Sequence, residues 1–277
     1  MTDISCRFTR QTHTADTVSA AWLLPIVSSV VAAASGGIVA NALMPFDPLL
    51  ARYTIIVSYV VWGTGVPLAC FIMTLYIYRT AVGGVPAAAA FPSLFLPLGP
   101  CGQGSFGILL LGKVMRDLTY QHGVGFAVLP PGATNSASIL SMADAIYAGG
   151  LVTGLILWGL GFCWYTLAMA MTLDHGLRNR VFFSPECFSI GWTAYTFPIG
   201  VWATATNLLA SELDSTAFKV IGTVVSLQVA LSWLYIFLMT MWKVWEGTIF
   251  VAPELAKFEG RPPLRFGGKV ERDVEKA

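Results

Sequence analysis

The sequence predicts an all-α protein that crosses a membrane six times. Hydrophobic residues make up 56% of the 277-residue chain and charged residues only 11%, far from the composition of soluble domains. Long apolar runs that do not alternate with polar residues favour helices over a β-barrel. Six runs are long enough to span a bilayer, at residues 20–40, 54–78, 91–111, 145–171, 188–209 and 220–242. They define a transmembrane domain, residues 20–250, between a polar N-terminal segment, residues 1–19, and a polar tail, residues 251–277.

Positive charge is distributed unevenly about these spans. With six spans both termini share one side of the membrane, and that side collects twelve Lys and Arg residues against four on the other. Basic residues accumulate on the cytoplasmic side. Both termini, and the tail that carries much of this excess, are therefore predicted to be cytoplasmic, in a multi-pass protein surrounded by lipid.

Prolines recur in the first member of each successive helix pair, at Pro25, Pro97 and Pro198. A proline inside a helix removes a backbone hydrogen bond and kinks the axis. Irregular backbone at membrane depth is tolerated where it lines a protein interior or an aqueous path. The spacing therefore predicts three helical hairpins whose kinked members line a common pore. The alternative is that these prolines only bend helices for packing.

Residues 99–107 are the most irregular part of any span. A helix that restarts after Pro100 would direct its free amides, and the positive end of its dipole, at whatever occupies the break. Gly102, Gln103, Gly104 and Ser105 are therefore candidate anion-facing residues. The glycines can equally permit close helix contact. Their GxGxxG spacing does not indicate a nucleotide site, because no strand precedes it.

Several classes of function are disfavoured by what the spans lack. No Asp, Glu, Lys, Arg or His lies between their ends, which argues against a side-chain proton relay. Ser93, Cys101 and Ser105 have no histidine or carboxylate in their span, so an enzyme is not expected. The five cysteines form no CxxC pair, and we expect no metal site and no cofactor. A net charge of +1 without a basic patch gives no indication of nucleic-acid binding.

Four ordered motifs, at residues 22–37, 99–107, 195–198 and 247–253, resemble the tellurite-resistance/dicarboxylate transporter family. That family includes fungal sulfite efflux pumps, malate permeases and plant slow anion channels. The resemblance implies a trimer-forming, pseudo-fivefold fold of ten helices, in which the first helix of each hairpin lines a pore. The resemblance places Phe197 at the position of an aromatic gate. A ring beside Pro198 would form a hydrophobic constriction that closes the pore by dewetting. A packing or lipid-facing role is the alternative for this ring.

The chain matches only the last six of the ten helices, and three hairpins cannot close a five-hairpin ring. We expect a transporter of small anions, foremost one for sulfite efflux across a fungal plasma membrane. The alternatives are a C4-dicarboxylate (malate) permease and a fragment that does not transport by itself.

Overall fold

The computed structural model describes residues 18–83, 88–127, 136–179, 188 and 190–247. In this part of the chain there are helices and no strands, which confirms the predicted all-α class. The α-helices are α2 (Leu24–Leu43), α3 (Pro48–Gly83), α4 (Leu98–His122), α5 (Ser136–Asn179), α6 (Thr196–Glu212) and α7 (Thr216–Trp245). Short 3-10 helices precede three of them, namely η2 (Ala20–Leu23), η3 (Ala88–Phe95) and η5 (Ile190–Tyr195).

Five described helical segments are long and apolar enough to cross a membrane: Ala20–Leu43, Pro48–Val82, Pro92–His122, Ala137–Asp174 and Thr216–Trp245. The remaining predicted span, residues 188–209, contains η5 and most of the 17-residue α6. An all-α membrane protein is thus confirmed. The predicted terminal segments lie outside the described residues, apart from residues 18 and 19.

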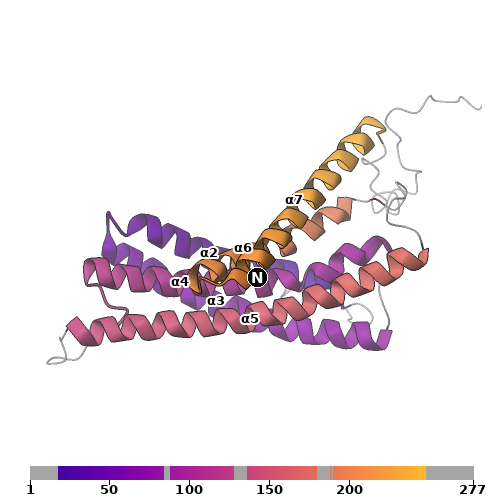
Figure 1. Ribbon diagram of the computed structural model, residues 1–277. Helices are drawn as coiled ribbons and strands as arrows, with labels where there is room; N and C mark the ends of the chain where they lie inside the picture. Colours follow the sequence, from indigo (N-terminus) through magenta and orange to yellow (C-terminus); the bar gives the residue numbers. More distant parts are fainter. Residues whose placement is uncertain (1–17, 84–87, 128–135, 180–187, 189, 248–277) are drawn as a thin grey trace, which may run out of the picture.

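The helices form three antiparallel hairpins, α2–α3, α4–α5 and α6–α7 (Figure 1). Hydrogen bonds cross between partners: the Ser105 hydroxyl donates to the Gly154 carbonyl at 2.7 Å, and the Asn207 amide donates to the Ser226 hydroxyl at 3.2 Å. In Figure 1, α7 leaves the bundle at an oblique angle.

The first helices of the hairpins lie side by side, with α4 between α2 and α6. In the most apolar 18-residue stretch of each helix, 89% of the residues are buried in α4 and 44% in α2. The corresponding fractions are 28% in α3, 22% in α5 and 17% in α7. The chain therefore forms an inner row, α2–α4–α6, that is covered on one side by the outer helices. The outer helices present apolar side chains outwards, as expected of a surface that meets lipid. On α7 these side chains include Val220, Val224, Leu227 and Leu231.

Each inner helix begins at a junction between a 3-10 helix and an α-helix. Pro25 occupies the first turn of α2, Pro97 is the N-cap of α4, and Pro198 is the third residue of α6. A first-turn proline sacrifices no α-helical hydrogen bond, because the first-turn N–H groups have no partner within the helix. The predicted kinks within continuous helices are therefore replaced by changes of helix type. Among the described α-helices it is an outer one, α3, that carries an interior proline, Pro67.

Candidate anion pathway

One face of α4 remains open between its neighbours. The partly exposed residues in the body of the helix are Phe106, Leu110, Lys113, Arg116 and Asp117. Arg116 lies over Tyr147 of α5, and the spacing of three or four residues places the other four on one face. Gln103 continues this face towards the start of the helix. We call Gln103 and these four residues the α4 stripe.

The inner helices α2 and α6 flank the α4 stripe. A methyl group added to Gly107 would lie 3.3 Å from the Ala34 side chain of α2, and one added to Gly99 would lie 3.7 Å from the Phe197 ring of α6. The rest of the circumference of α4 contacts α3, α5 and α6. A solute that moves along the inner row would therefore follow this stripe.

Two of the predicted anion-facing residues serve close packing of helices. A Cβ at Gly102 would lie 2.6 Å from the backbone nitrogen of Trp202, so α6 passes directly over this glycine. A Cβ at Gly104 would lie 2.9 Å from Val66, and the Gly104 carbonyl accepts a hydrogen bond from the Trp62 indole at 2.9 Å. Both glycines stand on faces that other helices cover, which agrees with the packing alternative for them.

Ser105 is also turned away from the stripe. Its side chain is fully buried and donates to the carbonyl of Gly154 on α5 at 2.7 Å. Since the hydroxyl is already engaged between two helices, Ser105 joins α4 to α5. An anion would have to break that contact to reach it.

Gln103 differs from its neighbours in having a free polar group. Its side chain is 9% exposed, and no hydrogen bond to its carboxamide is found among the described residues. Among the described residues, the side-chain nitrogen and oxygen atoms that have neither solvent contact nor a hydrogen-bond partner are the hydroxyls of Tyr59 and Tyr76. The Gln103 carboxamide is not one of these groups, so it is not sealed from solvent. A carboxamide offers two N–H donors, and these suit an anion.

Phe197 lies near the start of the stripe. It is the second residue of α6, and 45% of it is exposed. Its ring faces Gly99, one helical turn before Gln103. The structure therefore brings Phe197 and Gln103 to the same end of the stripe, although they are far apart in the sequence.

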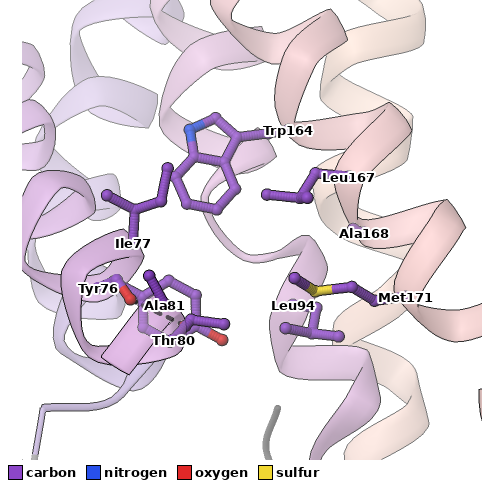
Figure 2. A pocket seen from close by; sticks show the side chains of 9 residues that line it. All are labelled: Tyr76, Ile77, Thr80, Ala81, Leu94, Trp164, Leu167, Ala168 and Met171. Atoms are coloured by element: carbon purple, nitrogen blue, oxygen red, sulfur yellow. Dashed lines mark hydrogen bonds between the residues drawn. The ribbon is translucent and has the colours of Figure 1, made fainter. Parts of the chain in front are cut away.

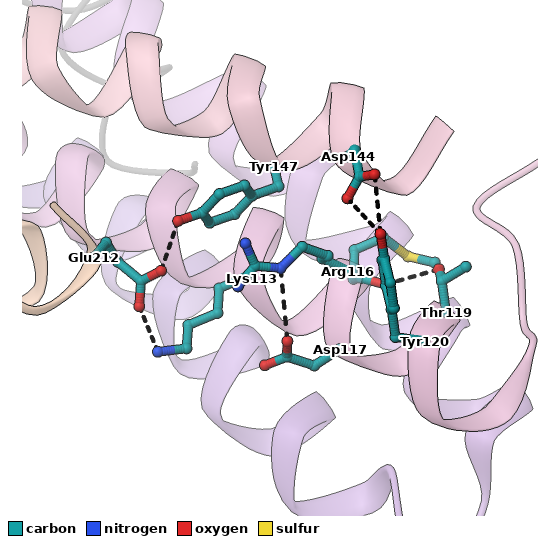
Figure 3. Close-up of polar contacts among 9 residues, drawn as sticks. Lys113, Arg116, Asp117, Thr119, Tyr120, Asp144, Tyr147 and Glu212 are labelled. Carbon is teal, nitrogen blue, oxygen red and sulfur yellow. Dashed lines mark hydrogen bonds and ion pairs between the residues drawn. The ribbon is translucent and has the colours of Figure 1, made fainter. Parts of the chain in front are cut away.

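The far end of the stripe holds a charged cluster that the sequence analysis missed (Figure 3). The Lys113 ammonium donates to the Glu212 carboxylate at the end of α6, and Tyr147 of α5 donates to the other oxygen of Glu212 at 2.7 Å. The Arg116 guanidinium lies 3.7 Å from the centre of the Tyr147 ring and pairs with Asp117 at 3.8 Å. The partners Lys113 and Glu212 are separated by 99 residues in the chain, so no local sequence motif joins them.

A cavity of about 250 Å³ lies away from this path, between α3, η3 and α5 (Figure 2). Its walls are almost entirely apolar, and its lining includes Leu94, Trp164, Leu167 and Met171. Apart from the hydroxyls of Tyr76 and Thr80 and the indole N–H of Trp164, such a lining offers no polar side-chain group to compensate an anion for its lost hydration. The cavity is therefore not part of the candidate pathway.

Inner helices without charge along most of their length, beside an open stripe in a membrane protein, are the arrangement expected of transporters and channels. The sequence model of the family described as voltage-dependent anion channel matches residues 3–241. The chain belongs to this family.

The curated relatives include sulfite efflux pumps and a malic acid transport protein. The chain is 40% identical to the sulfite efflux pump of Arthroderma otae and 39% identical to that of Arthroderma benhamiae, each over 87% of this chain and 58% of the relative. It is 25% identical to the malic acid transport protein of Schizosaccharomyces pombe, over 82% of this chain and 47% of that protein. The chain thus spans less than two thirds of the length of these relatives. No solved structure matches it significantly.

Proposed function

We propose that the protein moves small anions across a membrane along the α4 stripe, and that sulfite efflux is its reaction. The observation that carries this proposal is the combination of a free, buried carboxamide at Gln103 with a half-exposed Phe197 at the same end of the inner row. The likeness to sulfite efflux pumps, over 87% of the chain, supports sulfite as the substrate.

The chemistry required of such a path is modest. Gln103 offers N–H donors that replace part of the hydration shell of the anion, while Phe197 narrows the path and excludes water when the path is empty. Gly102, Gly104 and Ser105 act indirectly, because they allow α3, α5 and α6 to approach α4 closely. Pro25, Pro97 and Pro198 fix where each inner helix begins. No group acts as nucleophile or base in this scheme, and the protein is proposed to transport rather than to catalyse.

The complete assembly is also part of the proposal. Closure of these three hairpins with two more into a ring of five would place the stripe on the wall of a central pore. We further propose a homotrimer in the plasma membrane of a fungus, with both termini in the cytoplasm. The excess of Lys and Arg on the side of the termini supports this orientation.

A C4-dicarboxylate such as malate is the second candidate substrate, because the malic acid transport protein of Schizosaccharomyces pombe is among the relatives. The contrasting possibility is a chain that carries no anion by itself and acts only with further hairpins. Competition between sulfite and malate tests whether malate is the substrate. Flux measured on the chain alone tests whether the chain transports without further hairpins.

The test is flux of radiolabelled sulfite from proteoliposomes that contain the purified chain. Saturable flux above that of protein-free vesicles, inhibited more strongly by unlabelled sulfite than by malate, is the expected result. Stronger inhibition by malate would select the dicarboxylate. Flux equal to that of empty vesicles would contradict transport by this chain alone.

A further inference from the structure

The ion pair at the far end of the α4 stripe is asymmetric. The Lys113 side chain is 36% exposed and lies on the open face, whereas the Glu212 side chain is 9% exposed. Only the cation can therefore be approached from the path. An ammonium group has three N–H donors, and Glu212 is the one described acceptor of Lys113.

Glu212 has a second anchor that does not depend on Lys113. Its Oε2 atom accepts the hydrogen bond of Tyr147, and the Tyr147 ring is in turn covered by the Arg116 guanidinium. The charged and titratable groups around Glu212 are thus Lys113 and Arg116 of α4 and Tyr147 of α5 (Figure 3). Burial alone would raise the pKa of Glu212, but the hydrogen bonds from Lys113 and Tyr147 and the positive charges of Lys113 and Arg116 outweigh it and lower this pKa, which favours the ionised carboxylate.

We propose that Lys113 is an anion-binding residue of the pathway, and that Glu212 is an internal carboxylate that occupies Lys113 until a small oxyanion displaces it. The ligand is a compact anion that accepts hydrogen bonds from the N–H groups of an ammonium. Sulfite belongs to this chemical class. This inference rests on the proposed function and adds to it a second polar station beyond Gln103.

The geometry makes this exchange feasible. Removing one partner of a buried ion pair normally leaves an uncompensated charge, and that is costly. Glu212 is spared part of this penalty because Tyr147 holds its second oxygen, and Arg116 lies over the same ring. Tyr147 is therefore a positioning residue that keeps the displaced carboxylate in place. The exposed face of Lys113 is meanwhile free to receive the anion.

A second ion pair provides a matched control. Lys219 and Asp214 pair at the turn between α6 and α7, where their side chains are 55% and 91% exposed. Both members are open to water, and neither lies on the α4 stripe. Loss of this pair should leave anion binding unchanged, since surface pairs contribute little.

The experiment measures binding without transport. Thermal unfolding of the detergent-purified chain, followed by tryptophan fluorescence, is titrated with sodium sulfite, and sodium gluconate keeps the ionic strength constant. A ligand that binds the folded state raises the melting temperature. We compare the unmodified chain with Glu212→Gln, Lys113→Gln, Lys113→Arg, the double variant Lys113→Gln/Glu212→Gln, and Lys219→Gln.

The proposal predicts opposite effects of the two partners. Glu212→Gln removes the competitor and lowers the half-saturating sulfite concentration by roughly fivefold, the value of a modest ion pair. Lys113→Gln raises the half-saturating sulfite concentration by about tenfold or more, which corresponds to the loss of a charged hydrogen bond. Lys113→Arg retains most of the binding, Lys219→Gln changes nothing, and the double variant behaves like Lys113→Gln.

A pair with only a structural role gives a different pattern. Glu212→Gln and Lys113→Gln would then lower the melting temperature alike and leave the half-saturating concentration unchanged. That result, or the absence of a sulfite-dependent shift in the unmodified chain, overturns the inference. Sulfite flux from proteoliposomes tests the proposed function separately. If Lys113→Gln still transports sulfite and binds it with the half-saturating concentration of the unmodified chain, the transport function stands and Lys113 is rejected as a binding site.

Discussion

Phe197 carries the clearest prediction at the residue scale. Its ring is half exposed at the start of the inner row and faces Gly99, which has no side chain to hold it. If the ring closes the path, Phe197→Ala should raise anion flux several-fold, because the hydrophobic constriction is removed. Proteoliposome flux measures this change.

The control for Phe197 is Phe71, an exposed aromatic residue of the outer helix α3. Phe71→Ala removes the same ring from the outward surface and should leave flux unchanged. Equal flux in Phe197→Ala and the unmodified chain would assign Phe197 to packing or to lipid contact.

Gly102 supports a prediction about stability. A Cβ at this position would lie 2.6–2.9 Å from backbone atoms of Val201 and Trp202, which cannot move aside without shifting α6. Gly102→Ala should therefore destabilise the chain by about 1–3 kcal/mol, as overpacking does. The measurement is thermal unfolding in detergent.

Gly159 of α5 is the matched control, since nothing lies within 4 Å of a Cβ added there. Gly159→Ala should be neutral or stabilising by up to about 1 kcal/mol, because alanine favours the helix. If both variants unfold at the temperature of the unmodified chain, α4 and α6 do not touch as described.

At the element scale, a polar network fixes the junction that precedes the candidate gate. Gln228 of α7 accepts a hydrogen bond from the Tyr165 hydroxyl at 2.5 Å and donates one to the Tyr195 hydroxyl at 2.7 Å. Tyr195 ends η5 and packs edge-on against Phe95 of η3 at 4.6 Å between ring centres. The outer helix α7 therefore anchors the backbone immediately before Phe197.

Gln228→Leu tests this anchor. Losing the two hydrogen bonds should destabilise the chain by about 1–3 kcal/mol and increase flux by loosening the junction. In a Phe197→Ala background it should add no further flux, because the constriction is already absent. Ser226→Ala, on the same helix but bonded to Asn207, is the control that should leave flux unchanged.

Hydropathy predicts the elements well and their junctions poorly. The six apolar runs correspond to the described helices, and several of these continue beyond the runs, as α5 does at Ser136–Asn179. The prolines indicated the inner helices but not their local role, since a first-turn proline and an interior proline look alike in sequence. The structure distinguishes them because it shows where the 3-10 helices end.

The site was only partly predictable for a similar reason. Gln103 and Phe197 stand out in the sequence, but only the fold shows that they share one end of the stripe. Lys113 lies two residues beyond the predicted end of its span, and Glu212 lies three residues beyond the end of its own. Two ionisable residues just past the same ends of parallel helices were a usable signal, because parallel helices bring corresponding ends together.

At the scale of the whole molecule, anion transport along the α4 stripe requires water to reach the inner row. The stripe lies between α2 and α6, on the face of α4 that the outer helices leave open. If this face lines an aqueous path, side chains along it are hydrated even though they lie within a membrane span. The opposite face of α4 is packed against α5 and should remain dry.

Cysteine accessibility along α4 tests this claim most directly. In a background without native cysteines, single cysteines replace Phe106 and Leu110 on the stripe and Ile108 and Leu109 on the buried face, and membranes are treated with a charged, membrane-impermeant thiol reagent. We expect rapid labelling at positions 106 and 110 and little at positions 108 and 109. Absence of labelling at positions 106 and 110, or equal labelling at all four positions, would contradict an anion pathway along the α4 stripe.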